Sequence, residues 1–326
     1  MFIVLEATAP AHPVGGDMFF APFGHCSLGR GVWLESSTNI ALLWSAARSL
    51  AVLQTLHSSG VLSIEFSAPR RLLCLHIRRE HPGMKKSNQQ SPDELPRILV
   101  GTSGFAYKEW KGTFYPGDLP AKKYLSFYAE HFSTTEINNT FYRMPTVKLT
   151  EGWYAEVPDG FSFTLKLSQR ITHFKRLKNI DEEMNFFLTS AAGLKEKLGP
   201  ILVQLPPNFK KDIVVLEDFL AKFASQARLA FEFRHDSWFD DELFELLRKH
   251  NAAFGVVEKE EGTETPREVT GPFVYMRLRK GEYSADEMLD WARWIRSQRV
   301  PVYCYLKHDD HAPLLATELL KALGQC

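Results

Sequence analysis

From Arg97 onward, short continuous apolar runs alternate with longer segments in which apolar residues recur every three or four positions. Short continuous runs are typical of strands buried on both faces, whereas the longer spacing is typical of amphipathic helices. The pattern predicts strands near residues 97–103, 134–140, 161–167, 200–205, 228–234, 252–258, 272–278 and 300–307. It predicts helices at residues 121–132, 146–157, 180–198, 212–224, 240–250, 284–297 and 313–323, with no clear helix between the sixth and seventh strands.

The alternation of strand and helix is typical of parallel βα units. About 240 residues follow Met84, close to the ~250 residues of a single eight-unit barrel. No G-x-G-x-x-G or G-x-x-x-x-G-K sequence follows a predicted strand, which argues against a nucleotide-binding Rossmann or P-loop domain. We therefore predict an α/β fold, a single (β/α)8 TIM barrel preceded by a poorly structured N-terminal extension.

Residues 1–83 differ from the rest, because Pro, Gly and His interrupt the apolar runs before a period is established. Residues 84–96 are polar and begin with Met84, as a native N-terminus would. The expected organisation is a non-native or disordered extension at 1–83, a polar linker at 84–96 and a barrel domain at 97–326. A small accessory domain at 1–83 is the alternative.

The most apolar segment, residues 40–56, is expected to form a buried or amphipathic helix and not a membrane span. Arg48 lies at its centre, and the segment falls short of the ~20 residues that a span needs.

The formal net charge is zero, so no overall field favours nucleic acid or an anionic membrane. The cysteines have neither a C-x-x-C pair nor zinc-ligand spacing, so the reducing cytoplasm is the expected location: Cys26, Cys74, Cys304 and Cys326.

Polar and charged residues interrupt the predicted strands near their C-terminal ends, where barrel enzymes build their sites. A charge inside a buried strand costs several kcal/mol unless it is paired or used. Alternate residues of a barrel strand face the lumen, so Ile137, Phe231 and Phe233 should face outward. The same parity predicts a mixed-charge pocket of inward side chains: Glu136, Asn138, Lys166, Gln204, Glu232, Arg234, Tyr275 and Arg277.

Glu136 and Glu232 are the candidate catalytic residues, because a carboxylate whose pKa is set by neighbouring cations can act as a general base. Lys166, Arg234 and Arg277 are expected to converge on a phosphate or carboxylate, for which arginine provides two parallel donors. The candidate ligand-binding residues are Asn138, Lys166, Gln204, Arg234, His235, Trp238, Tyr275 and Arg277. Because Glu232 is expected to serve function, Glu232→Gln should cost less than about 1.5 kcal/mol of stability.

Two other interpretations of these residues stay open. The charges could form a structural ion-pair lattice that fills the barrel. A mixed nitrogen and oxygen metal site for hydrolysis or isomerisation could be supplied by Glu136, Glu232, Glu258, His235 and His308. No H-x-H or H-E-x-x-H spacing supports such a site, and the sequence predicts neither a particular cofactor nor an oligomeric state.

A basic loop, residues 168–179, follows the third predicted strand and contains Arg170, His173, Lys175, Arg176 and Lys178. With aromatic residues at the barrel rim, it could contact a phosphate backbone. A nucleic-acid-binding or nuclease-like protein is therefore the main rival to a small-molecule site, and a non-catalytic partner-binding module is the third possibility. No membrane partner is expected.

Six segments, in this order and spacing, resemble the YecE-like family, also called domain of unknown function 72: GTSGFAYKEWKGTFYP, TTEINNTFYRMP, FTLKLSQRITH, VQLPPNF, FEFRHDSW and YMRLR. The resemblance covers residues 97–323 and implies a TIM barrel without an established biochemical role. The chain departs from many members at Arg279, where they have His, and at Lys307 and His308, where they have an Asn pair. We interpret the chain as a cytoplasmic protein that binds or acts on a phosphorylated or other anionic ligand, with enzymatic activity left open.

Overall fold

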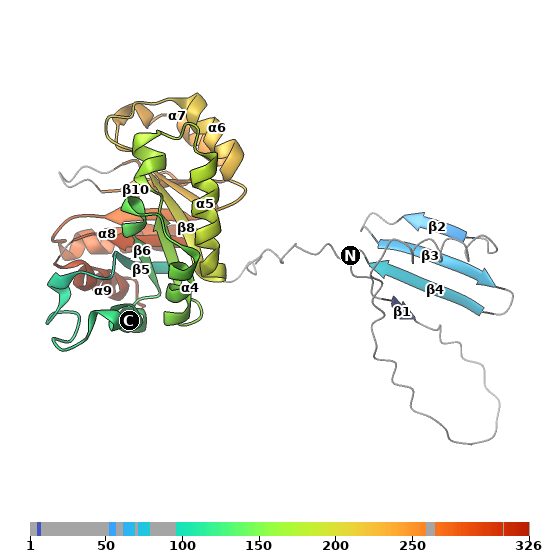
Figure 1. Cartoon of the computed structure of the whole chain (residues 1–326), viewed down its shortest axis with the longest axis horizontal. Coiled ribbons are helices and arrows are strands. Elements are labelled where there is room, and N and C mark those ends of the chain that lie inside the picture. Colours follow the sequence, from blue (N-terminus) through green and yellow to red (C-terminus); the bar gives the residue numbers. More distant parts are fainter. Residues whose placement is uncertain are drawn as a thin grey trace, which may run out of the picture. The chain divides into compact units, whose positions relative to one another are not determined.

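The computed structural model describes residues 5–7, 52–56, 61–68, 71–78, 96–258, 265–308 and 310–325. The chain divides into two compact units, Met1–Asp93 and Glu94–Cys326, each with its own sheet (Figure 1).

In the described part of the second unit, parallel strands form a closed eight-stranded barrel. Each strand pairs with the next one along the chain, and the last pairs with the first. The strands are β5 (Ile98–Ser103), β6 (Thr134–Ile137), β7 (Ser162–Lys166), β8 (Leu198–Gln204), β9 (Leu229–Glu232), β10 (Ala253–Val257), β11 (Val274–Leu278) and β12 (Val302–Leu306). The TIM barrel and its predicted strands are confirmed.

Helices follow seven of the eight strands and surround the barrel in Figure 1. The described residues between β10 and β11, which omit 259–264, contain no helix, as the sequence indicates. They are α2 (Tyr124–His131), α3 (Asn139–Tyr142), α4 (Val147–Glu156), α5 (Asp181–Ala191), α6 (Ile213–Phe223), α7 (Asp241–Lys249), α8 (Ala285–Ser297) and α9 (Ala312–Ala322). Polar residues fix several helix starts: Ser284 and Glu287 form a capping box on α8, and the Asp240 carboxylate accepts a hydrogen bond from the Leu243 N–H in α7. All seven predicted helices are present.

One strand ends earlier than its sequence indicates. The predicted strand at 134–140 stops at Ile137, and the short helix α3 begins at Asn139. Asn138 has helical backbone angles (φ −89°, ψ −23°). The Thr140 hydroxyl then donates 3.0 Å to the Ile137 carbonyl and 2.7 Å to the Lys166 carbonyl. These hydrogen bonds tie the end of β6 to the end of β7.

Alternation along the strands separates two apolar clusters. Ile137, Phe231 and Phe233 belong to the large core between the strands and the helices, as predicted. A second cluster consists of the inward residues of the barrel: Leu99, Leu202, Ala230, Ala253, Phe273, Tyr275, Tyr303 and Tyr305. This inner layer fills the lumen below the charged strand ends, so polar groups at the mouth have an apolar floor.

Close strand contact at the barrel floor requires a glycine. A Cβ atom added to Gly101 of β5 would lie 2.0 Å from the carbonyl oxygen of Thr134 in β6. The Thr134 hydroxyl lies 2.8 Å from the Tyr305 hydroxyl, which is also 2.8 Å from the Thr164 hydroxyl. The buried Tyr305 hydroxyl thus has polar partners from two strands.

The first unit contains a four-stranded antiparallel sheet with the order β1-β4-β3-β2. Its strands are β1 (Leu5–Ala7), β2 (Val52–Leu56), β3 (Val61–Ala68) and β4 (Arg71–Arg78). The helix predicted for residues 40–56 is wrong at its end, because Val52–Leu56 pairs with β3 as a strand. The sequence did not indicate this sheet within the predicted extension. The remaining residues of 1–83, most of 84–96, and residues 40–51 lie outside the described residues.

Within the described part of the chain, none of the helices has both the length and the apolar character needed to cross a membrane.

Candidate functional site

A buried guanidinium at the C-terminal mouth of the barrel joins two buried carboxylates. Arg277 of β11 lies between Glu136 of β6 and Glu232 of β9, and all three side chains are at most 1% exposed. Arg277 Nη2 lies 2.8 Å from Glu136 Oε1, and Nη1 lies 2.5 Å from Glu232 Oε2. This arrangement brings the two candidate catalytic residues together, but through a shared cation.

Glu136 is held as a carboxylate by several donors. The hydroxyls of Ser103 and Tyr275 donate to its two oxygens, one each, and Arg277 adds the ion pair. Asn138 Nδ2 supports Ser103 by donating to its hydroxyl over 2.8 Å. Burial alone would raise the pKa of Glu136, but the Arg277 charge and these hydrogen bonds outweigh burial and hold the pKa below its ordinary value.

Glu232 has four side-chain donors. Its Oε1 accepts from Gln204 at 2.7 Å, from Arg279 at 3.0 Å and from Arg234 at 3.2 Å, while Oε2 accepts from Arg277. Burial opposes ionisation, but the charges of Arg277, Arg279 and Arg234 together hold the pKa of Glu232 well below its ordinary range. A general base needs a pKa near the working pH, so both carboxylates are poor bases in this geometry.

Glu258, at the end of β10, fixes the loop that follows β11. Its Oε2 accepts from the backbone N–H groups of Arg279 at 3.1 Å and Lys280 at 3.3 Å, and from the Tyr283 hydroxyl. Its role is therefore to position Arg279 against Glu232.

Three half-buried cationic side chains at the mouth have nitrogen atoms that donate to none of the described residues. Arg234 is 34% exposed and bonds Glu232 through Nε alone, so its two terminal nitrogens have no partner in the described part of the chain. The ammonium groups of Lys166 and Lys307 likewise have neither a hydrogen bond nor an ion pair with the described residues. Lys166 ends β7 and Lys307 follows β12, so these donors come from separate parts of the rim.

The pKa values of these groups are lowered first by burial and then by neighbouring cations. Burial and then the Arg277 charge lower the pKa of Lys166 to about 7. Burial, Arg277 and Arg279 lower the pKa of Lys307 as well. His173, in the basic loop, has its pKa lowered to about 4 by burial and then by Lys166 and Arg234. Burial and the neighbouring cations together therefore disfavour the protonated forms of these groups more than the carboxylates favour them.

The structure brings together most of the residues predicted from sequence. Direct or shared hydrogen bonds and ion pairs connect Glu136, Asn138, Gln204, Glu232, Arg234, Tyr275 and Arg277, with Lys166 beside them. Sequence reasoning did not assign Ser103, Arg279 and Lys307 to the site. Ser103 lies two residues after Gly101, Arg279 two after Arg277, and Lys307 two after Tyr305. Because alternate residues of a barrel strand face the lumen, the same rule could have found all three.

Two predicted ligand-binding residues have other partners. Trp238 is fully buried, its Nε1 donates 2.7 Å to the Phe209 carbonyl, and its ring lies 4.7 Å from that of Phe233. His235 Nδ1 accepts from the Ser237 N–H at 3.1 Å and caps a short 3-10 helix. In the part of the chain that the structure describes, neither side chain bonds to Glu136, Glu232 or Arg277 at the barrel mouth.

The metal interpretation finds no support in the geometry. The described ranges contain no group of three or more His, Cys, Asp or Glu side chains placed to hold a metal ion. Glu136, Arg277 and Glu232 have instead the arrangement expected of a buried ion-pair lattice.

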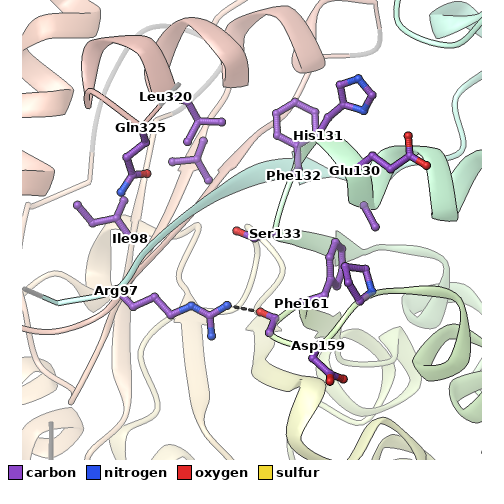
Figure 2. A pocket seen from close by; sticks show the side chains of 14 residues that line it. Arg97, Ile98, Glu130, His131, Phe132, Ser133, Asp159, Phe161, Leu320 and Gln325 are labelled. Carbon is purple, nitrogen blue, oxygen red and sulfur yellow. Dashed lines mark hydrogen bonds between the residues drawn. The ribbon is translucent and has the colours of Figure 1, made fainter.

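A cavity of about 510 Å³ lies at the opposite end of the barrel, where strands begin (Figure 2). Arg97, Ile98, Ser133 and Phe161 line it, and the Arg97 guanidinium donates to the Gly160 carbonyl. None of the charged residues at the C-terminal mouth lines this cavity. The N-terminal face of a TIM barrel serves stability in known enzymes, so the candidate site remains the charged mouth.

The fold and the polar strand ends define a TIM-barrel protein with a charged C-terminal mouth. A family model described as "Protein of unknown function DUF72" matches residues 99–326. The chain belongs to this family, in agreement with the sequence resemblance.

Individual proteins are also similar to this chain, in sequence or in structure. The UPF0759 protein YecE of Escherichia coli K12 is 30% identical over 116 residues, which are 35% of this chain and 43% of the relative. The chain thus matches less than half the length of this curated relative. A DUF72 family protein (TM1631) from Thermotoga maritima has a similar structure, with a TM-score of 0.62 and 28% identity over 70% of this chain and 99% of the other. A DUF72 family protein (EF0366) from Enterococcus faecalis, with a TM-score of 0.58 and 20% identity, covers 70% of this chain and 98% of its own and shares the fold.

Proposed function

We propose that the barrel mouth binds a phosphorylated or other anionic small molecule in the cytoplasm. The observation that carries this proposal is a charge imbalance. Two ionised carboxylates, Glu136 and Glu232, lie among five cationic side chains: Lys166, Arg234, Arg277, Arg279 and Lys307. An anion at the rim would relieve the repulsion between these cations and pair with their unused donors.

The buried, paired cation and the half-buried cations at the rim have different roles in this proposal. Arg277 is 1% exposed and is paired with both carboxylates, so it braces the site and does not contact the ligand. Arg234 presents two terminal nitrogens, and Lys166 and Lys307 present ammonium groups, that bond to none of the described residues. These three residues would hold the anion by charge-assisted hydrogen bonds.

Thermal unfolding of the full chain with added anions tests the proposal. Inorganic phosphate, sugar phosphates, nucleotides and small carboxylates should be compared with chloride at equal ionic strength. An anion at ~100 times its Kd should stabilise the fold by about 2.7 kcal/mol. Arg234→Gln should abolish this stabilisation.

The matched control is Arg293→Gln on α8, where Arg293 is 73% exposed and 3.8 Å from Asp290. This variant should respond to anions as the wild-type chain does. If every anion shifts the wild-type chain and Arg234→Gln equally, the anionic-ligand proposal fails and a partner-binding surface becomes the better explanation.

A second candidate, nucleic-acid binding, is favoured by one observation. A groove of about 560 Å³ is lined by Lys175, Arg176, Lys178, Asn208, Phe209, Lys210, Lys211 and Asp212. Several of its cations are already paired, however: Lys175 lies 2.7 Å from Glu183, and Lys211 bonds both Asp240 and Glu242. Affinity for a short oligonucleotide that falls steeply with salt and is weakened by Lys210→Gln, but not by Arg234→Gln, would favour this candidate.

A further inference from the structure

Two aromatic side chains are exposed to solvent at the C-terminal mouth of the barrel. Tyr142 of α3 is 75% exposed, and Phe174, the last residue of the π-helix η4 (Arg170–Phe174), is 72% exposed. In the part of the chain that the structure describes, no other large apolar side chain is as exposed. The two residues follow the neighbouring strands β6 and β7, whose ends carry Glu136 and Lys166. Two such rings beside a charged site are a candidate binding surface.

The loop backbone defines the outward position of Phe174. The Lys175 N–H donates 3.0 Å to the Arg170 carbonyl, and the Leu177 N–H donates 3.0 Å to the Ile171 carbonyl. Leu177 has a φ of 66°, a left-handed conformation that is unfavourable for a side chain of this size, and its side chain is buried. Single π-turns and backbone in rare conformations concentrate at functional sites. A specific backbone conformation therefore presents Phe174 to solvent.

Tyr142 is connected to the cations of the mouth through one other ring. The rings of Phe141 and Tyr142 lie 5.0 Å apart and are perpendicular, and Lys166 Nζ lies 4.1 Å from the Phe141 centroid. The Thr140 hydroxyl donates 2.7 Å to the Lys166 carbonyl and so joins the loop after β6 to the end of β7. Lys166 Nζ contacts the Phe141 ring and not the Tyr142 ring. A ligand that touches both the ammonium and Tyr142 must therefore span the space between them.

The second exposed ring belongs to a segment that packs on the same aromatic residue. Phe174 follows His173, whose ring lies 4.9 Å from the Phe141 ring. Lys166 and the terminal nitrogens of Arg234 have no hydrogen-bond partner among the described residues. A small anion would pair with these cations and leave both exposed rings in water. A ligand that carries a planar ring as well as an anionic group would use both features.

We propose that the ligand of the mouth is a nucleoside monophosphate, whose phosphate pairs with the rim cations and whose base stacks on Tyr142, with Phe174 as a second aromatic contact. A base has an aromatic face that stacks on exposed rings, and the ribose supplies the spacer between that face and the phosphate. This inference rests on the proposed anion site and names the class of ligand that the site takes.

Isothermal titration calorimetry of the full chain with four matched ligands tests the inference. Adenosine 5′-monophosphate (AMP) is compared with ribose 5-phosphate, phenyl phosphate and inorganic phosphate at equal ionic strength. AMP should bind about tenfold more tightly than ribose 5-phosphate, which has the same phosphate and sugar but no base. Phenyl phosphate has a ring without the ribose spacer, so it should bind no more tightly than ribose 5-phosphate. Phenyl phosphate that binds as tightly as AMP would overturn the inference.

Substitutions at the exposed rings locate the base. Tyr142→Ala should remove the advantage of AMP and leave the Kd of ribose 5-phosphate unchanged, whereas Tyr142→Phe should retain the advantage because stacking needs only the ring. Phe174→Ala should reduce the advantage in part. The matched control is Phe186→Ala on α5, where Phe186 is 51% exposed, and it should bind AMP as the wild-type chain does. Thermal unfolding confirms that each variant is folded.

The results separate failure of this inference from failure of the anion site. Equal affinity for AMP and ribose 5-phosphate, lost for both in Arg234→Gln, would support the anion site and overturn the nucleotide inference. Adenosine binding as tightly as AMP, with AMP binding unchanged in Arg234→Gln, would overturn both. A single-stranded oligoadenylate that binds far more tightly than AMP and is weakened by Lys210→Gln would make nucleic acid the ligand and overturn the inference.

Discussion

Arg277 Nη1 lies 2.5 Å from Glu232 Oε2, and each of these two side chains is 1% exposed. Removing one partner of a buried ion pair leaves the other charge uncompensated, at a cost of about 3–5 kcal/mol. We therefore expect Glu232→Gln to lose about that much stability, and not the smaller amount that the sequence suggests. Urea unfolding of both proteins measures the difference.

An exposed glutamate in a surface ion pair provides the control for this substitution. Glu217 on α6 is 49% exposed and lies 2.6 Å from Lys249. Glu217→Gln should change stability by less than about 0.5 kcal/mol. If Glu232→Gln proves as mild as Glu217→Gln, the buried lattice contributes little to the fold.

Acid should weaken the fold through the same carboxylates. Because the pKa values of Glu136 and Glu232 are lowered in the folded state, the unfolded chain binds more protons as the pH falls below about 4.5. Their stabilisation is complete above that pH and is lost progressively below it. Unfolding free energies measured from pH 6 to pH 3 should therefore fall less steeply for Glu136→Gln than for the wild-type chain. Parallel slopes would show that Glu136 is not preferentially ionised by folding.

Replacing Lys166 should stabilise the protein. Its folded-state pKa of about 7 means that protonating this amine is unfavourable at the mouth, so Lys166→Met should gain about 0.5–2 kcal/mol at pH 7. The gain should shrink between pH 7 and about 10.4, where only the unfolded chain retains the proton. Lys148→Met, at an exposed position on α4, is the control and should have almost no effect. A Lys166→Met variant less stable than wild type at pH 7 would contradict this account of its environment.

The barrel should fold without the first unit. All eight barrel strands pair with one another inside Glu94–Cys326. A chain beginning at Met84 should therefore unfold cooperatively, with a Tm close to that of the barrel transition in the full chain. Differential scanning calorimetry compares them, and loss of cooperative unfolding would make residues 1–83 part of the barrel's stability.

Strand periodicity and parity predict much of this architecture because both follow from backbone geometry. They place Glu136, Glu232 and Arg277 in the lumen, as the structure does. They do not predict which donor meets which carboxylate, because Glu136 and Arg277 are 141 residues apart in sequence and meet only when the barrel closes. For that reason the sequence suggests a ligand as the partner of Arg277, whereas the structure pairs it with two carboxylates.

The first unit shows another limit of periodicity. Its strands β3 and β4 contain β-branched and aliphatic residues, but the surrounding Pro, Gly and His residues conceal any longer pattern. Antiparallel pairing between β3 and β4 depends on contacts that local composition does not reveal.

Anomalous diffraction from crystals soaked in tungstate, a heavy analogue of phosphate, tests the anion site most directly. The account predicts a tungsten peak at the C-terminal mouth, with its oxygens within about 3.2 Å of the Arg234 terminal nitrogens and of the Lys166 or Lys307 ammonium. The peak should disappear in Arg234→Gln. An empty mouth in wild-type crystals, with tungstate bound only at the groove around Lys210, would contradict the account.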